Sequence, residues 1–220
     1  MHAQSADALY ADRVNLPSAT RAAEIWTAAM HDRPDDFEAT WKLSRIAYWL
    51  GGHAPDADRR GFLERGVKAG DAARRLSPQR PEGYFWLAAN MGALAERLGG
   101  RRALGYRKPI KEALETALAM DPAFLNGATD RALGRWYFRV PRLFGGSNSQ
   151  AEAHLRASLR YDPNSTLSHL FLADVLADQG RTREARAELQ AVLDAPLSVE
   201  WAPEDADNKQ AARERLAQLR

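Results

Sequence analysis

Three arginines at four-residue steps are the residues of this sequence that are best placed to bind a ligand. They are Arg131, Arg135 and Arg139. Residues four apart lie on one face of an α-helix, so the three guanidinium groups form a stripe. A guanidinium group binds carboxylate or phosphate through two parallel hydrogen bonds. The stripe therefore predicts a surface that holds an anionic group.

A second interpretation of this stripe requires no ligand. Charges at helical spacing are most often a solvated helix face, or they pair with acidic residues of the same chain. The acidic residues considered for such pairs are Asp130, Glu38 and Asp174. The sequence alone leaves both interpretations open.

No other group of residues predicts catalysis or a metal site. The sequence contains no cysteine, which excludes disulfides, thiolate catalysis and cysteine-ligated metals. Its serines lack the glycines of a nucleophile elbow, and no glycine-rich loop is suited to cradling phosphate. Its five histidines never fall at the three- or four-residue spacing with which a helix binds one metal ion. We therefore expect a protein that is not an enzyme, with no cofactor and no metal.

Composition and charge narrow the class of protein further. With 45% hydrophobic and 27% charged residues, the chain is ordinary for a soluble globular protein, and no apolar run predicts a transmembrane segment. Its 31 basic residues against 29 acidic ones leave a net charge of +2, so we expect no nucleic-acid binding. Residues 1–5 lack the apolar core of a signal peptide. The expected location is periplasmic if a leader has been removed, and cytoplasmic otherwise.

Proline punctuates the helices that must position the stripe. Helical stretches end near Pro34, Pro78, Pro122, Pro163 and Pro196, which are 44, 44, 41 and 33 residues apart. The last separation is close to a tetratricopeptide unit, a helix-turn-helix of about 34 residues. The longer separations predict the same unit with longer loops, around residues 51–59, 99–108 and 140–149. No segment alternates polar and apolar residues for long enough to form a strand.

These patterns predict an all-α fold, a tetratricopeptide-like α-solenoid in a single domain over residues 1–220. We expect about five helix pairs, about eleven helices in all. Leu133, Gly134 and Tyr137 have the spacing of the crossing point in the first helix of a unit. Residues 203–219 predict an amphipathic helix that caps the array.

Three segments carry a resemblance to known families. They read GYFWLAANMGALAE (residues 83–96), YRKPIKEALETALAMDPAF (residues 106–124) and ALGRWYFRVPRLFGGSNSQAEAHLRASLRYDPNST (residues 132–166). They resemble bacterial proteins related to the T component of tripartite periplasmic TRAP transporters, and the helical domain of the regulator of microtubule dynamics family. The resemblance covers residues 22–219, and its most particular motif is Leu133–Tyr137 followed by Pro141–Gly146. It implies a tetratricopeptide-like bundle that binds partners or an amphipathic small ligand without catalysis.

In a tetratricopeptide array, the first helix of each unit lines a concave groove. We place in this groove two sets of residues that mix aromatic and arginine side chains. They are Trp41, Arg45, Tyr48 and Trp49 in one unit, and Arg131, Arg135, Phe138 and Arg139 in another. Such a mixture suits a ligand with an anionic group and an apolar body. The alternative is that the aromatic residues form the core between repeats.

Asn90 is a polar residue on an otherwise apolar helix. A buried amide requires a hydrogen-bonding partner. Asn90 therefore either orients a ligand in a cavity or closes a neighbouring helix end or a loop carbonyl, which is the more common arrangement.

Two functions are consistent with these residues. The first is a non-catalytic binding or scaffold protein that holds a protein partner or an anionic amphipathic small ligand. The resemblance to TRAP components implies an accessory role in solute uptake, with a periplasmic solute-binding protein as partner. The second is a pure assembly protein that forms homo-oligomers and has no small-molecule site.

Overall fold

The computed structural model describes residues 5–219, and within them it contains eleven α-helices, one short 3₁₀ turn and no strand. The all-α tetratricopeptide-like fold is therefore confirmed. Contacts between residues divide the chain into two compact units, Met1–Asp121 and Pro122–Arg220, here called unit 1 and unit 2. Each unit is described by itself, and the single domain over residues 1–220 stays a prediction.

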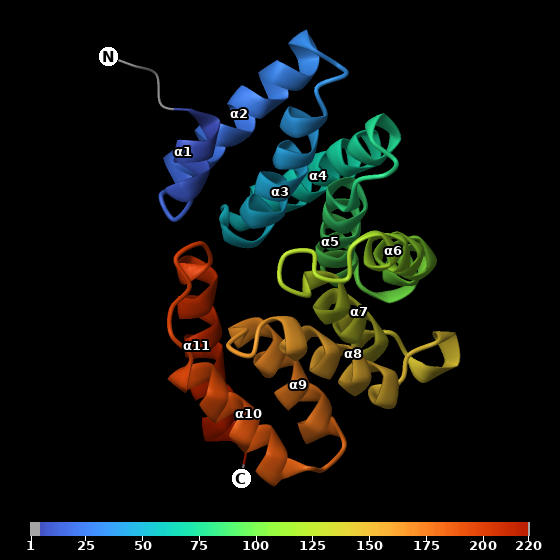
Figure 1. Cartoon of the computed structure of the whole chain (residues 1–220), viewed down its shortest axis with the longest axis vertical. Coiled ribbons are helices and arrows are strands. Elements are labelled where there is room, and N and C mark those ends of the chain that lie inside the picture. Colours follow the sequence, from blue (N-terminus) through green and yellow to red (C-terminus); the bar gives the residue numbers. More distant parts are fainter. Residues whose placement is uncertain (1–4, 220) are drawn as a thin grey trace. The chain divides into compact units, whose positions relative to one another are not determined.

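Over residues 5–121, unit 1 has six helices joined by short turns (Figure 1). They are α1 (Ala6–Ala11), α2 (Leu16–Asp32), α3 (Phe37–His53), α4 (Asp56–Leu76), α5 (Pro81–Leu98) and α6 (Gly100–Met120). Each helix packs against the next as far as α6, and α3 also contacts α5 directly. Residues of α1, α2 and α3 bury a common apolar core that includes Leu9, Trp26 and Ile46.

Within residues 122–219, unit 2 contains five helices and the 3₁₀ turn (Figure 1). They are α7 (Ala128–Arg139), η1 (Arg142–Phe144), α8 (Asn148–Tyr161), α9 (Thr166–Asp178), α10 (Thr182–Asp194) and α11 (Ala202–Gln218). The odd-numbered helices α7, α9 and α11 contact one another in sequence, as first helices of successive tetratricopeptide units do. The last helix, α11, buries Ala212 against Leu170, Leu189 and Val192 of α9 and α10.

The five prolines stand at equivalent places in the structure. Each lies two residues beyond the last residue of an even-numbered helix, in the turn that leads away from α2, α4, α6, α8 or α10. A residue that precedes proline is disfavoured in the helical conformation, so each helix stops before it. At Asp121 and Asp162 the backbone is extended, with φ of −149° and −138°.

The predicted long loops are wrong at two of their three places. Residues 51–53 complete α3 and residues 56–59 begin α4, while residues 100–108 belong to α6. The 44-residue spacing arises because α4 and α6 are each 21 residues long. Glycine is typical of a helix end, but Gly51 lies inside α3, where a side chain would overlap Leu63 of α4. Of the three predicted places, residues 140–147 do form a loop, and it contains the 3₁₀ turn η1.

Gly134 lies where α7 crosses α8, as its spacing predicts. A Cβ atom at this position would lie 2.6 Å from Cγ of Leu155 and 3.1 Å from the carbonyl oxygen of Ala151. Only a residue without a side chain permits this approach. The crossing fixes the direction in which α7 presents its arginines.

Candidate functional site

The predicted groove residues fall into the two different units. Those in unit 1 are Trp41, Arg45, Tyr48 and Trp49 on α3 and Asn90 on α5; those in unit 2 are Arg131, Arg135, Phe138 and Arg139 on α7. The two sets are therefore considered as separate surfaces.

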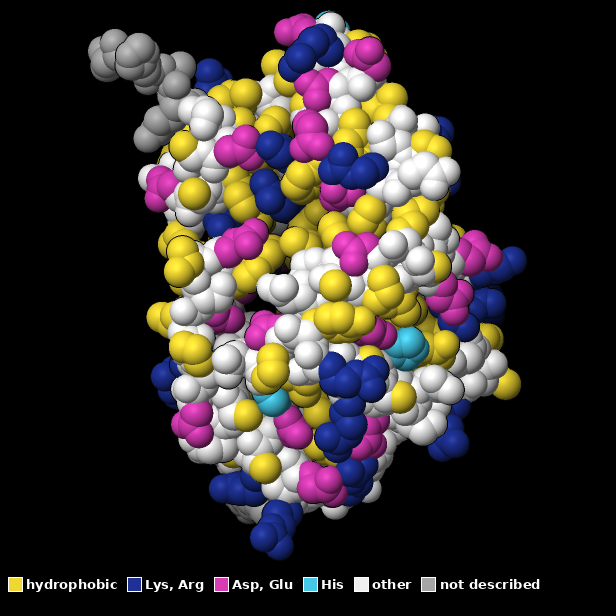
Figure 2. All heavy atoms as spheres, viewed as in Figure 1, with side chains coloured by type: hydrophobic (Ala, Val, Ile, Leu, Met, Phe, Trp, Pro, Cys, Tyr) yellow, Lys and Arg dark blue, Asp and Glu magenta, His cyan; other side chains and the backbone are white. Residues whose placement is uncertain are grey.

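In unit 1, Arg45 is enclosed by aromatic rings of its own chain. Its guanidinium carbon lies 3.7 Å from the ring centre of Tyr10, 4.9 Å from that of Trp41 and 6.0 Å from that of Trp26. The Arg45 side chain is only 13% exposed, and Asp7 lies 3.9 Å from its terminal nitrogen. Tyr10, Trp26 and Trp41 thus form an aromatic box that Arg45 itself occupies. Figure 2 shows basic side chains set among hydrophobic ones over α1–α3.

Trp49 and Tyr48 lie in opposite environments. Trp49 is buried, and its indole nitrogen donates a hydrogen bond to the carbonyl oxygen of Arg13 at 3.1 Å. Its ring stacks on His53 with the ring centres 3.5 Å apart. Trp49 therefore ties α3 to the segment after α1 and does not take the predicted groove position. Tyr48 is 41% exposed, and its ring lies 5.9 Å from that of Trp86.

Asn90 joins three helices of unit 1. It is fully buried, and its amide nitrogen donates to the carbonyl oxygens of Ser44 and Trp86 at 2.9 and 2.8 Å. The Ser44 hydroxyl in turn donates to the carbonyl oxygen of Gly66 at 2.8 Å. Gly66 has no room for a Cβ atom because the Asn90 amide occupies that space. The partners of Asn90 are carbonyls inside α3 and α5, and neither is the helix end or loop carbonyl that the second interpretation named.

In unit 2, Arg135 faces an acidic residue of α9. Its terminal nitrogen lies 3.4 Å from one carboxylate oxygen of Asp174, and its guanidinium group lies 4.7 Å from the ring centre of Phe171. The other carboxylate oxygen of Asp174 is 3.0 Å from Nε of Arg215 on α11. The pairing of the stripe with Asp174, one of the alternatives from the sequence, is present. Phe171 and Arg215 were not predicted.

Three arginines act on this one carboxylate. Burial raises the pKa of Asp174, the positive charges of Arg215, Arg135 and Arg139 oppose it, and the pKa remains above its ordinary value. Two guanidinium groups, Arg135 of α7 and Arg215 of α11, thus pair with a single acidic side chain of α9, and Arg139 of α7 adds a positive charge nearby. We call Arg135, Arg139 and Arg215 around Asp174 the arginine face.

The other predicted residues of α7 lie at the borders of this surface. Arg131 is half-buried, and Arg139 is exposed. Phe138 is half-buried and packs against the core of α8 and α9, which includes Leu155 and Leu172. Asp130 is buried and lies 2.7 Å from Nδ1 of His154 on α8. Glu38, the third acidic candidate, accepts a hydrogen bond from the Trp41 indole at 2.9 Å.

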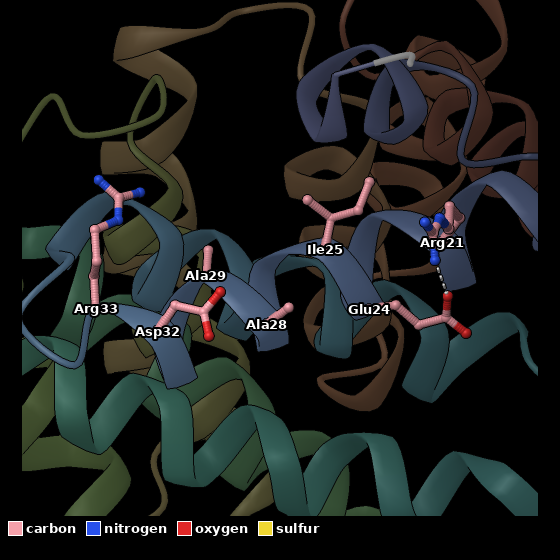
Figure 3. Close-up of a pocket in the computed structure, with 7 residues that line it drawn as sticks. All are labelled: Arg21, Glu24, Ile25, Ala28, Ala29, Asp32 and Arg33. Carbon is pink, nitrogen blue, oxygen red and sulfur yellow. Dashed lines mark hydrogen bonds and ion pairs between the residues drawn. The ribbon is translucent and has the colours of Figure 1, made fainter.

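An open hollow also runs along α2, and none of the predicted site residues lines it (Figure 3). Its lining comes from one helix and the residue after it: Arg21, Glu24, Ile25, Ala28, Ala29, Asp32 and Arg33. Arg21 and Glu24 form an ion pair with each other at 2.9 Å. Across residues 5–219 no group of histidine and acidic side chains is arranged to hold a metal ion. No helix in that range is long and apolar enough to span a membrane.

The family of the chain follows from a match over most of its length. Residues 3–144 match the family model described as regulator of microtubule dynamics protein 1-3. The chain belongs to this family. Residues 146–198, which span α8, α9 and α10, match a tetratricopeptide repeat model. No curated protein matches the chain. The resemblance to TRAP transporter components stays a prediction.

Solved structures show the same fold. The thermophilic tetratricopeptide protein TTC0263 of Thermus thermophilus has 23% identity, covers 95% of this chain and 96% of its own, and gives a TM-score of 0.71. MamA has 13% identity over 96% of this chain and 99% of its own, with a TM-score of 0.56. YrrB, described as a tetratricopeptide protein with an unusual peptide-binding site, has 19% identity, with 90% and 91% coverage and a TM-score of 0.52.

Proposed function

We propose that the chain is a non-catalytic scaffold that binds an acidic segment of a protein partner on the arginine face of unit 2. Tetratricopeptide proteins generally mediate protein binding, which supports a protein partner. The observation that carries the proposal is the pairing of Arg135 and Arg215, from two different helices, with the one carboxylate of Asp174. Carboxylates from a partner would extend this network through further charge-assisted hydrogen bonds.

The contrast with unit 1 supports this choice of surface. The aromatic box is filled by Arg45, and Trp49 is held in the core by a hydrogen bond to Arg13. Neither leaves an aromatic face for the apolar body of a small ligand. An extended acidic peptide requires no cavity, only cations along a row of helices.

The names of the related families suggest two partners. The matched family is named for the regulation of microtubule dynamics, and the TRAP-like resemblance suggests a periplasmic solute-binding protein. The arginine face requires the same feature of either partner, a segment rich in aspartate or glutamate. The pure assembly function and an amphipathic small ligand are the alternatives that the experiment must separate from this one.

The test is the affinity of a fluorescently labelled glutamate-rich peptide, measured by anisotropy. Arg135→Ala removes a charge-assisted hydrogen bond of about 1.5–3 kcal/mol, so we expect binding at least about ten-fold weaker. Asp174→Asn removes the carboxylate of the chain itself that competes with the peptide for the arginines, so it should strengthen peptide binding. Added salt should weaken binding to the wild-type protein, because exposed ionic contacts are screened.

The matched control is Arg156→Ala on α8, whose side chain pairs with Glu152 one turn away at 2.8 Å. This change removes the same charge from unit 2 but not from the arginine face, so the peptide affinity should stay unchanged. Equal affinity for the wild type, Arg135→Ala and Asp174→Asn would contradict the proposed site. Homo-oligomers in native mass spectrometry, without peptide binding, would favour the assembly function.

A further inference from the structure

The loop between α7 and α8 presents two neighbouring apolar side chains to solvent. Leu143 is 87% exposed and Phe144 is 40% exposed. Within residues 5–219 they are the only exposed large hydrophobic residues that are adjacent in sequence. We call Leu143 and Phe144 the loop tip. In Figure 1 this loop, drawn in yellow, projects from unit 2, and Figure 2 shows hydrophobic side chains at the outline of the molecule there.

Hydrogen bonds hold the loop in this conformation. The amides of Phe144 and Gly146 both donate to the carbonyl oxygen of Pro141, at 2.8 and 3.2 Å, and the Ser147 amide donates to the carbonyl oxygen of Tyr137 at 2.9 Å. Gly145 has a φ of 106°, and Gly146 has no space for a side chain beside the carbonyl oxygen of Val140. The backbone thus fixes the tip outward before any partner arrives, which lowers the entropic cost of binding.

The sequence on both sides of the loop tip carries charge of one sign. Between Asp130 and Glu152 the sequence contains four arginines and no acidic residue. Arg142 lies next to the tip, and Arg139 ends the helix before it; both are exposed. Apolar side chains flanked by basic ones are the composition with which proteins bind an anionic membrane surface.

We propose that the loop tip docks the protein on the surface of an anionic membrane. Leu143 and Phe144 enter the boundary between headgroups and acyl chains, and Arg142 contacts lipid phosphate. A protein partner would need a preformed apolar pocket for this projecting tip, whereas a lipid interface adapts to it. The proposal does not depend on the arginine face binding an acidic segment, and the two can fail separately.

The test is sedimentation of the protein with vesicles of phosphatidylcholine and phosphatidylserine, against vesicles of phosphatidylcholine alone. A single loop should give weak, reversible binding that requires the anionic lipid. Leu143→Asp should lower the partition coefficient at least about ten-fold. It removes the leucine that the membrane would bury and adds a negative charge that the anionic lipid repels. Arg142→Ala should lower it about five-fold, since one basic residue near an anionic surface contributes that much.

The matched control is Leu197→Asp, which changes another exposed leucine, 57% exposed and outside the loop. It should bind the vesicles as the wild type does. Absence of wild-type binding to anionic vesicles would overturn the proposal, as would equal binding by Leu143→Asp. If vesicle binding is absent and Leu143→Asp instead weakens the acidic-peptide complex, the loop serves a protein partner and the membrane proposal is wrong.

Discussion

The two units use arginine in opposite ways. In unit 1 the guanidinium group of Arg45 is surrounded by three aromatic rings and its side chain is 13% exposed. In unit 2 the guanidinium group of Arg135 has the ring of Phe171 beside it and shares the carboxylate of Asp174 with Arg215. The same residue type in the predicted groove is therefore a packing element in one unit and part of a charged surface in the other. The difference is that three aromatic rings surround Arg45, whereas Arg135 has one ring beside it and a carboxylate that a second arginine shares.

The largest expected effect concerns the crossing that holds the stripe in place. Gly134→Leu places a branched side chain where a Cβ atom would already lie 2.6 Å from Leu155, so α7 must move away from α8. We expect a loss of about 1–3 kcal/mol in unfolding free energy, measured by urea denaturation. Gly92→Leu on α5, where a Cβ atom meets no neighbour within 4 Å, is the matched control and should not destabilise. An unchanged midpoint for Gly134→Leu would contradict the crossing.

A smaller effect separates the two kinds of arginine. Arg45→Ala empties the aromatic box and removes its cation–π and packing contacts, for which we expect about 1–2 kcal/mol of destabilisation. Arg139→Ala changes an exposed residue and should alter stability by no more than about 0.5 kcal/mol. The acidic-peptide affinity should respond in the reverse order. Equal stability losses for the two variants would remove the distinction between the units.

The smallest expected effect is a pH dependence within unit 2. His169 has Glu188 within 2.6 Å of Nδ1 and the carbonyl oxygen of Pro163 within 2.9 Å of Nε2, so the imidazolium form satisfies both contacts. Burial lowers the pKa of His169, but these hydrogen bonds and the nearby acidic charges outweigh it, and the pKa is raised. A raised pKa means that the folded state binds the proton more tightly than the unfolded state.

The stabilisation should therefore be fully present below pH of about 6.5, the unfolded value, and be lost as pH rises through the folded pKa. Denaturation curves across this range test the prediction, with Glu188→Gln as the variant that should flatten the dependence. A stability that rises with pH over the same window in the wild type, and equally in Glu188→Gln, would show that His169 is not its source.

Much of the fold could be predicted because it depends on local signals. Proline stops each even-numbered helix, and Gly134 allows the α7–α8 crossing, so both are visible as single residues in the sequence. Helix lengths were harder to predict. Gly51 is a close-packing residue within α3 rather than a helix end. The sequence alone does not distinguish these two roles of glycine.

The site could be predicted less well because it depends on contacts between distant segments. Trp49 is buried, and its indole nitrogen donates to the carbonyl oxygen of Arg13 in the segment after α1. No pattern in the sequence predicts that this segment lies against α3. Arg215 was missed because α11 was considered only for its apolar face. Asp174 was found, since its charge made it a candidate partner of the stripe.

The most direct test of the central claim is NMR observation of side-chain N–H signals during titration with the glutamate-rich peptide. The account predicts shifts for the guanidinium signals of Arg135, Arg139 and Arg215 in unit 2, with the indole signals of Trp41 and Trp49 in unit 1 unchanged. Shifts confined to the indoles, or no guanidinium shift at a peptide concentration that saturates the anisotropy signal, would contradict it.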